Sequence, residues 1–236
     1  MESDPHIALS IIIPALDEAA GIEATLAPLQ ALRARGCEVI VVDGGSRDAT
    51  RALAASRADR VMEAPRGRAA QMNAGARAAR GGTLLFLHAD TLLPASAPES
   101  ILEGLERSAR AWGRFDVEIE GAGPFLALVA AMMNARSRLT GIATGDQAIF
   151  ARRDAFDAAG GFPEIPLMED IALSKALKRR SAPLCLRERV VTSGRRWKRH
   201  GILRTVLLMW RLRLAYALGA DPRSLARRYD VERTSP

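Results

Sequence analysis

The amino-acid sequence predicts an α/β protein with a mixed, mostly parallel sheet that is flanked by helices. Three apolar runs, in residues 10–18, 39–46 and 84–91, have the Leu, Ile, Val and Phe content of buried strands and end at acidic residues. Segments with the apolar spacing of helices separate these runs. Because strands that alternate with helices are joined by right-handed crossovers, most of the predicted strands should run parallel.

Strands and helices alternate regularly in the first 90 residues. The first predicted helix places Ile22, Leu26, Leu29 and Leu32 on one face, and Gly36 can end it. Ser46 and Asp48 are capping candidates for the second helix. Strands are predicted for residues 8–13, 39–42, 60–62 and 83–87, and helices for residues 18–35, 46–56 and 68–80.

The second half of the chain is less regular. Helices are predicted for residues 98–110, 124–139, 154–159, 170–180 and 201–218, and strands for residues 112–119, 148–151 and 184–191. The last helix is amphipathic: its apolar face holds Leu203, Val206, Leu207, Trp210, Leu214 and Ala217, and Arg204, Arg211 and Arg213 flank that face. Two interpretations are open for this helix, namely packing on the rest of the protein or docking on an anionic membrane.

Length and composition predict one domain over residues 1–200 and a basic helical tail over residues 201–236. The chain has 236 residues, of which 48% are hydrophobic and 26% charged. The sequence shows no signal peptide, and arginines interrupt the one apolar stretch long enough to span a bilayer. Two cysteines, Cys37 and Cys185, fit a reducing cytoplasm. We therefore expect a cytoplasmic protein, with possible peripheral attachment to the inner face of the membrane.

Charge is distributed unevenly along the chain. The whole chain has a net charge of +7, while residues 178–236 alone contain 16 basic and 4 acidic side chains, a net charge of +12. Such asymmetry favours an anionic partner for the C-terminal segment: phosphate, lipid headgroups or nucleic acid.

The ends of the first two predicted strands carry the residues expected to bind a ligand. Pro14 closes the first strand, and Asp17 and Glu18 follow it. Asp43 ends the second strand before two glycines, where the backbone can turn tightly beside a ligand. An acid in this place can accept hydrogen bonds from ribose hydroxyls or from a base N–H. The G-x-G-x-x-G and P-loop motifs are absent, which argues against a nicotinamide enzyme and a P-loop NTPase.

Two further groups point to a diphosphate. Arg66 and Arg68 lie at the beginning of a predicted helix, where guanidinium groups and the helix dipole both favour anions. Asp90 ends the strand of residues 83–87, where a carboxylate can hold Mg²⁺ or Mn²⁺ against a diphosphate. His88 is either a second metal ligand or a structural histidine.

These motifs together resemble the family-2 glycosyltransferases of GT-A fold, the Rossmann-like fold of nucleotide-diphospho-sugar transferases. The similarity is carried by S-I-I-I-P-A-L-D-E, V-V-D-G-G-S, R-G-R-x-x-Q-M-N-x-G and F-L-H-A-D-T, and extends from Leu9 to about Trp197. It implies a nucleotide-sugar donor, a hydroxyl acceptor, inversion and one divalent cation. The residues that it implies for donor binding are Pro14, Leu16, Glu18, Asp43, Gly45, Arg66, Arg68, Asn73, Asp90 and Arg196. Asp90 is the implied metal ligand, and His88 is the candidate for a second one.

The resemblance also implies which residues act on the acceptor. Met168-Glu169-Asp170 resembles the family's E-D motif, whose aspartate is the catalytic base, with Glu169 as the rival. Gly145, Asp146, Gln147 and Trp197 are implied on the acceptor side. The segment S-G-R-R-W departs from the Q-x-x-R-W motif of processive members at Ser193, which argues against polymer synthesis. The whole pattern is similar to a bacterial subgroup labelled arsenosugar-biosynthesis or radical-SAM/selenodomain-associated glycosyltransferases.

Two alternatives predict features that the sequence lacks. A nucleotidyltransferase on a similar sheet predicts a loop rich in lysine and glycine after the first strand, and residues 15–20 contain neither. A nucleic-acid-binding protein that uses the basic tail predicts aromatic residues interleaved with arginine, but aromatic residues are only 5% of the chain. We therefore expect a glycosyltransferase with no nucleic-acid partner and a possibly lipid-linked or hydrophobic acceptor.

Overall fold

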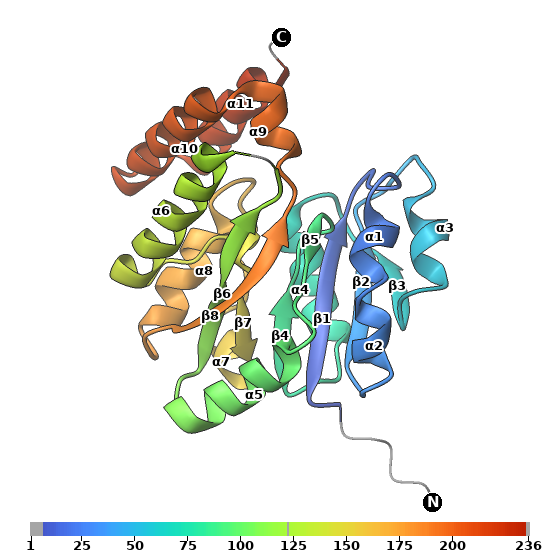
Figure 1. The fold of residues 1–236 in the computed structure, drawn as a ribbon. Coiled ribbons are helices and arrows are strands. Elements are labelled where there is room, and N and C mark those ends of the chain that lie inside the picture. Colours follow the sequence, from blue (N-terminus) through green and yellow to red (C-terminus); the bar gives the residue numbers. More distant parts are fainter. Residues whose placement is uncertain (1–6, 122, 235–236) are drawn as a thin grey trace, which may run out of the picture.

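The computed structural model describes residues 7–121 and 123–234, and it confirms the predicted α/β fold (Figure 1). The described residues form one sheet with the strand order β3-β2-β1-β4-β7-β6-β8-β5. Its strands are β1 (Leu9–Ala15), β2 (Glu38–Asp43), β3 (Arg60–Glu63), β4 (Thr83–Phe86), β5 (Thr91–Leu92), β6 (Trp112–Ile119), β7 (Phe150–Arg152) and β8 (Leu184–Thr192). Strands β1 to β4 pair in parallel, whereas β7 is antiparallel to both β4 and β6.

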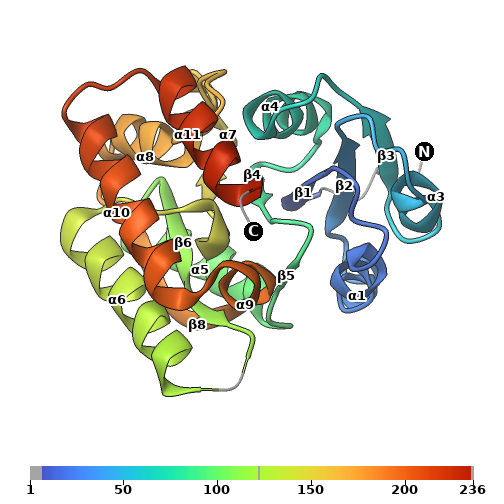
Figure 2. The same ribbon diagram turned by 90° about the horizontal axis from the view of Figure 1, so that it is seen from above.

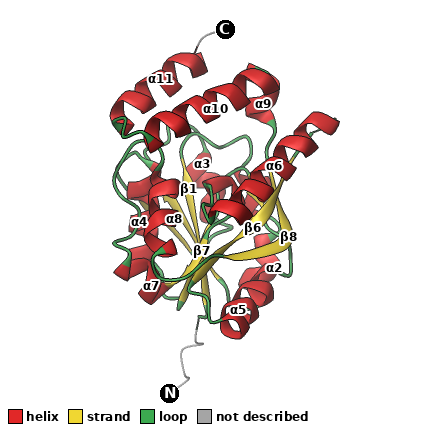
Figure 3. Cartoon of the chain, turned by 90° about the vertical axis from the view of Figure 1, so that its left-hand side faces the viewer, coloured by secondary structure: helices red, strands yellow, loops and turns green. Residues whose placement is uncertain are grey.

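Helices cover both faces of this sheet (Figure 3). They are α1 (Ile22–Leu26), α2 (Leu29–Arg33), α3 (Thr50–Ala55), α4 (Arg68–Ala78), α5 (Ala97–Ser108), α6 (Pro124–Thr140), α7 (Arg153–Ala158), α8 (Glu169–Lys178), α9 (Arg195–His200), α10 (Ile202–Ala217) and α11 (Pro222–Thr234). Alternate residues of β1 point to opposite faces: Ile11 and Ile13 pack among residues of α1, α2 and α5, and Ile12 packs among residues of α4, α7 and α8.

The helix predicted for residues 18–35 is divided in the structure. Helix α1 ends at Leu26 and α2 begins at Leu29, with Pro28 between them. Proline has no amide hydrogen and its ring crowds the preceding turn, so the helix ends there. Residues before Ile22 are also not helical, because the Glu18 amide donates to Thr50 Oγ1 (2.8 Å) and the Ala19 amide to Asp48 Oδ2 (3.0 Å).

Four of the described elements were not predicted from the sequence: the two-residue strand β5, the 3₁₀ turn Gly145–Gln147, helix α9 and helix α11. Strand β5 pairs with β8 at the edge of the sheet. It therefore forms only by pairing with residues about 100 positions away in the chain. Helices α9, α10 and α11 lie beyond the carboxyl-terminal end of β1 (Figures 1 and 3). None of the helices in the described part of the chain is long and apolar enough to cross a membrane.

Helices α10 and α11 pack against the beginning of α8. Met168, Ile171, Leu212 and Leu225 form a buried cluster, and Leu208, Met209, Tyr216 and Tyr229 pack around it. The face that the sequence predicts to be apolar lies on the other side of α10, where Leu203, Leu207, Trp210 and Leu214 are exposed. Helix α10 therefore has two apolar sides, of which one packs on the domain.

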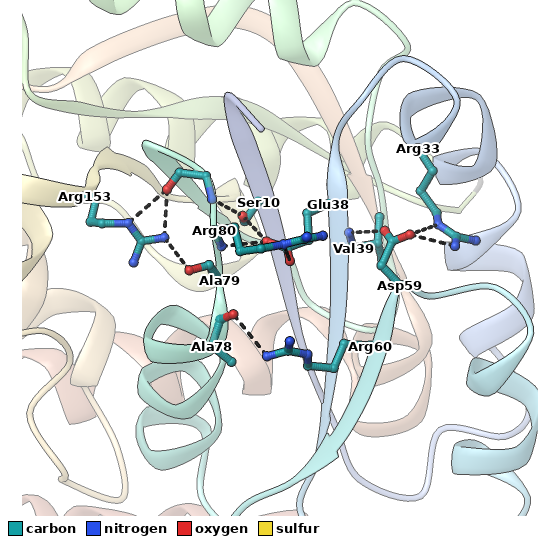
Figure 4. A network of polar contacts seen from close by, with 11 residues as sticks. Ser10, Arg33, Glu38, Val39, Asp59, Arg60, Ala78, Ala79, Arg80 and Arg153 are labelled. Carbon is teal, nitrogen blue, oxygen red and sulfur yellow. Dashed lines mark hydrogen bonds and ion pairs between the residues drawn. The ribbon is translucent and has the colours of Figure 1, made fainter. Parts of the chain in front are cut away.

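The amino-terminal ends of β1 and β2 are tied by buried polar contacts (Figure 4). Glu38 is buried, and its carboxylate accepts hydrogen bonds from Ser10 Oγ (2.6 Å), Arg80 N (2.8 Å) and Arg80 Nε (2.9 Å). Burial alone would raise the pKa of Glu38, but the bonds from Ser10 and Arg80 lower it below its ordinary value. Nearby, Arg153 donates to the carbonyl oxygens of Ala76, Ala79 and Gly81 at the end of α4.

Candidate active site

Asp43 shapes the turn after β2. Its carboxylate is fully buried and accepts hydrogen bonds from the amides of Gly45 and Ser46, both at 2.9 Å, and from the Ser46 hydroxyl. Gly45 has a φ of +90°, which glycine adopts without strain. The structure thus gives Asp43 intramolecular partners, and its predicted contact with a nucleotide stays a prediction.

The loops after β1 and β2 are fastened to each other. The Arg47 amide donates to Asp17 Oδ1 (2.8 Å), and the Asp17 amide donates to Ser46 Oγ (2.9 Å). Asp17 has a φ of 52°, which is uncommon for a residue other than glycine. Pro14 is buried in β1 and Leu16 is partly buried after it. These contacts fix the backbone of the loop that carries Glu18.

Helix α4 fixes the ends of β1 and β2 from one face of the sheet. Gln71 Nε2 donates to the carbonyl oxygens of Ala15 and Val42, both at 2.8 Å, and so joins the ends of β1 and β2. The side chain of Asn73 exchanges two hydrogen bonds with the backbone of Phe162 (2.7 and 2.9 Å). Asn73, predicted to bind the donor, therefore holds the segment that leads to α8. Arg66 is exposed just before α4.

Arg195 connects two of the predicted donor-binding acids. Its Nη2 atom lies 3.1 Å from Glu18 Oε2 and 3.7 Å from Asp90 Oδ2. The hydrogen bond from Arg195 to Glu18, together with the charge of Asp90, raises the pKa of the guanidinium. Glu18 and Asp90 are 72 positions apart in the chain, and the structure brings both to one cation.

Sequence reasoning missed Arg195 and selected its neighbour Arg196, whose side chain lies outside the described residues. The available signal was the position of Arg195 shortly after the end of β8, the strand that pairs with β5 directly after Asp90. The Ser193 amide donates to the Asp90 carbonyl oxygen (3.1 Å), and this contact sets the register. Trp197 packs instead with Ile119, Leu126 and Ala130, so its apolar contacts help to fix α9.

His88 lies against the acceptor-side segment. Its Nδ1 atom is 3.3 Å from Asp146 Oδ1. A Cβ at position 145 would overlap the imidazole ring, so Gly145 is the residue that allows this approach. Gln147 is buried, and its side chain accepts a hydrogen bond from the Thr144 amide (3.2 Å) within the 3₁₀ turn Gly145–Gln147. The predicted role of His88 as a metal ligand stays a prediction, and the structure gives it Asp146 as a partner.

Asp170 is held at the beginning of α8 by two backbone amides. Gly145 N donates to its Oδ2 atom (2.9 Å), and Ile171 N donates to its Oδ1 atom (2.7 Å). The preceding Met168 has a φ of 71°, an uncommon conformation for a bulky residue and one that recurs at functional sites. Asp170 is partly buried, so it is oriented and still within reach of solvent.

Glu169 and Arg68 complete the set of charges around Asp170. Glu169 is buried, and burial together with the charge of Asp170 raises its pKa, although Arg68 opposes this shift. Burial lowers the pKa of Arg68, but the charge of Glu169 and of other nearby groups raises it, and the pKa is raised overall. The Arg68 side chain nevertheless keeps a large exposed surface. Arg68 and the acids of the α8 segment are therefore close enough for their charges to influence one another.

The described residues contain no group of three or more His, Cys, Asp or Glu side chains that could hold a metal ion alone. Asp90 is the best-placed carboxylate, because it is partly exposed and its nearest charged partner is 3.7 Å away. Mg²⁺ and Mn²⁺ take oxygen ligands and commonly complete their shell with phosphate and water. These residues fit a cation that is shared with a bound diphosphate.

The arrangement defines an α/β protein that gathers acids and arginines at the carboxyl-terminal edge of its sheet, the edge at which open α/β sheets bind ligands. The family described as Glycosyl transferase family 2 matches residues 10–156, more than half of the chain, and the protein belongs to this family. The search of curated proteins gave no match.

Several solved structures share the fold. TarS 1–349 of S. aureus, in complex with UDP-GlcNAc, has a TM-score of 0.64 and 15% identity, covering 79% of this chain and 58% of that one. Mannosyltransferase PcManGT of Pyrobaculum calidifontis, with GDP-Man and Mn²⁺, has a TM-score of 0.63 and 22% identity, covering 90% and 62%. Glucosyl-3-phosphoglycerate synthase of Mycobacterium tuberculosis, with Mn²⁺, UDP and glucosyl-3-phosphoglycerate, has a TM-score of 0.57 and 19% identity, covering 78% and 70%.

These likenesses establish the GT-A glycosyltransferase fold for this chain. The chain spans about three fifths of the length of the TarS 1–349 and PcManGT chains.

Proposed function

We propose that this protein transfers a sugar from a nucleotide-diphosphate-sugar to a hydroxyl acceptor with inversion at the anomeric carbon. The observation that carries the proposal is the placement of two acid sites on one sheet edge. Glu18 and Asp90 meet at Arg195, and Asp170 is bound to the Gly145 segment that His88 contacts. Because His88 and Asp90 are separated by one residue, donor and acceptor groups would meet between these two sites.

On the donor side, Arg195 and Asp90 would receive the diphosphate. A Mg²⁺ or Mn²⁺ ion bound with Asp90 would offset the negative charge that grows on the departing diphosphate. Arg195 would release one of its two carboxylates to contact a phosphate oxygen, and exposed Arg66 and Arg68 are further cations on this side.

On the acceptor side, Asp170 would act as the general base. The acceptor oxygen forms a bond to the anomeric carbon on the face opposite the diphosphate, the bond from that carbon to the diphosphate oxygen breaks, and the hydroxyl proton moves to Asp170. Each Asp170 oxygen accepts one backbone hydrogen bond, which leaves lone pairs for the incoming hydroxyl. Glu169 is a weaker candidate, because it is buried and its raised pKa favours the protonated form.

A transfer assay tests this proposal. The protein would be incubated with Mn²⁺ and a panel of UDP- and GDP-sugars, and released nucleotide and the anomeric configuration of the product would be followed by NMR. Release of a nucleoside diphosphate with an inverted product supports the proposal. A retained configuration would remove Asp170 from its role, and release of pyrophosphate would favour a nucleotidyltransferase.

We also propose a finer placement in the family and the cell. The motifs resemble the arsenosugar-biosynthesis or radical-SAM/selenodomain-associated subgroup, and we place the protein in the cytoplasm, peripheral on the inner face of the membrane. Two apolar stripes support the membrane contact: Phe125, Leu128 and Met132 are exposed on α6, and Leu203, Leu207, Trp210 and Leu214 on α10, with Leu218 directly after it. Arg204 and Arg211 are exposed beside the second stripe. Such a surface suits a lipid-linked or hydrophobic acceptor.

Liposome sedimentation tests the membrane contact. We expect salt-sensitive binding to anionic vesicles that is lost in a Trp210→Ala, Arg204→Gln, Arg211→Gln variant. The matched control replaces Arg107 by Gln, because Arg107 is an exposed arginine on α5, away from these helices. An absence of vesicle binding at low salt would contradict the proposal.

A further inference from the structure

Arg136, on the side of α6 that faces the protein, has a guanidinium group with unmet hydrogen-bonding capacity. Among the described residues, its Nε and Nη2 atoms are buried and have no hydrogen-bond partner. Burial and the charges of Arg213 and Arg114 lower the pKa of Arg136 to about 10, although Asp170 opposes this shift. The group is therefore still charged at neutral pH. Leaving such a donor unpaired is costly, so a native site of this kind calls for an explanation.

The acids that accompany Arg136 and its neighbour Arg114 are already engaged. Asp116 accepts hydrogen bonds from Arg114 and, at 2.7 and 2.8 Å, from both terminal nitrogens of Arg138. Asp170 accepts its two hydrogen bonds from backbone amides, and no ion pair joins it to Arg136 within the described residues. Arg136 and Arg213 thus contribute two positive charges that these carboxylates do not pair.

The charges of both Arg213 and the proposed acceptor base Asp170 act on Arg136, so these groups lie in the same region of the structure. Arg136 comes from α6 and Arg213 from α10, and α10 lies between α6 and α11 in the view from above (Figure 2). Helix α10 packs on the beginning of α8, where Asp170 is found. The charge of Asp170 acts on both Arg136 and Tyr216 of α10, raising the pKa of each group relative to the same site without it. The cluster therefore faces the acceptor side of the site.

We propose that Arg136 and Arg213 form a subsite for an oxyanion, a phosphate or a carboxylate, that is carried by the acceptor. The inference rests on the proposed function, because it takes Asp170 as the group that faces the acceptor. A planar guanidinium with free Nε and Nη2 donors matches two oxygens of a phosphate or carboxylate. Binding of the anion would satisfy the buried donors and would place the acceptor hydroxyl near Asp170. The basic C-terminal segment, which supplies Arg213, would then serve acceptor recognition.

The experiment uses glycerol 1-phosphate as the probe, with glycerol as the uncharged control. Calorimetry of the full chain would compare the wild type with Arg136→Gln and Arg213→Gln. We expect a loss of affinity of at least about tenfold in each variant, as for a lost hydrogen bond to a charged group. Arg107→Gln is the control, because Arg107 is exposed on α5 and belongs to neither proposed binding surface. Its affinity for the probe should equal that of the wild type.

Stability without the probe distinguishes a ligand site from a structural arginine. Arg136→Gln removes an unpaired buried charge, so its melting temperature should rise by about 2 °C or more. A large fall would mean that Arg136 stabilises the fold, and would overturn the proposal. A parallel experiment uses vesicles of phosphatidylglycerol and phosphatidylcholine. If Arg136→Gln loses binding to these vesicles but binds glycerol 1-phosphate as the wild type does, the oxyanion is a lipid headgroup.

The same variants separate this inference from the proposed function. Titration with UDP or GDP and Mn²⁺ should give the same affinity in Arg136→Gln as in the wild type. If nucleotide binds, but Arg136→Gln binds both the probe and the vesicles as the wild type does, the subsite is overturned and the proposed function is not. Failure of every nucleotide to bind would contradict the proposed function, whatever the probe does.

Discussion

The two ends of the central strands use acidic residues in opposite ways. At the amino-terminal end, Glu38 is surrounded by donors from Ser10 and Arg80, and its pKa is lowered (Figure 4). At the carboxyl-terminal end, Glu169 is buried beside another carboxylate, and its pKa is raised. The first arrangement stabilises the ionised acid and the fold with it. The second disfavours the ionised acid, and acids with a shifted pKa are common where chemistry takes place.

The largest effect is expected for a substitution of Asp170 at the carboxyl-terminal end. Asp170→Asn keeps the size of the side chain but removes its ability to accept a proton, so kcat should fall by about 10²–10⁴-fold while donor affinity is nearly unchanged. Steady-state kinetics and nucleotide titration would measure both quantities. Glu169→Gln is made in parallel: a normal rate for Asp170→Asn with an inactive Glu169→Gln would transfer the role to Glu169. Normal rates in both would make Asp146 the next candidate.

At the opposite end of the strands, Glu38→Gln should destabilise the fold and spare the chemistry. Loss of charge-assisted bonds from Ser10 and Arg80 is expected to cost about 2 kcal/mol of unfolding free energy, discounted because Arg80 is half exposed. Urea denaturation would measure the cost. Since the folded-state pKa of Glu38 is lowered, the difference from the wild type should be full above pH 4.5 and vanish as the pH falls through the folded-state pKa. A difference that persists in acid would contradict this account.

Arg195 tests whether the pairing at the carboxyl-terminal end is functional. Arg195→Gln should weaken nucleoside diphosphate binding by about tenfold and change stability little, because its ion pairs are more than half exposed on the arginine side. Calorimetry and thermal denaturation would measure the two effects. A stability loss with unchanged nucleotide affinity would make Arg195 a structural residue like Arg80.

The smallest effect is expected at Glu169, with the opposite sign to Glu38. Because its folded-state pKa is raised, the ionised form contributes a penalty that appears as the pH rises above 4.5 and is complete above the folded-state pKa. Glu169→Gln should therefore be more stable than the wild type at neutral pH, by about 1 kcal/mol, and equal to it in acid. Denaturation at several pH values would test this, and a variant less stable at neutral pH would refute the opposite-sign comparison.

The sequence predicted the strands and the acids at their ends because both depend on local patterns. Apolar runs indicate buried strands, and Asp43, Asp90 and Asp170 lie at or next to the ends of elements. Contacts between distant segments were not predictable in this way. Arg195 meets Glu18 across 177 positions, and β5 forms only through β8. The helix at residues 18–35 was mispredicted because apolar spacing outweighed Pro28.

The roles of individual polar side chains were also beyond the sequence. Donor binding by Asn73 stays a prediction, and the pairing of its side-chain amide with the backbone of Phe162 could not be read from the sequence. Arg136 carried no signal in its motif, because its lack of partners follows from the packing of α6 and α10 around it. Hydrogen-bond satisfaction depends on the tertiary structure, and only the assembled fold reveals which donors remain unpaired.

Calorimetric titration with UDP and GDP, with and without Mn²⁺, tests most directly whether the carboxyl-terminal edge is the ligand site. The wild type, Asp90→Asn and Glu38→Gln would be compared at a temperature at which all three are folded. The account predicts that at least one nucleotide binds the wild type and Glu38→Gln equally, that Mn²⁺ strengthens this binding, and that Asp90→Asn loses the Mn²⁺ effect. Binding that is indifferent to Mn²⁺ and to Asp90, or that is lost in Glu38→Gln, would contradict it.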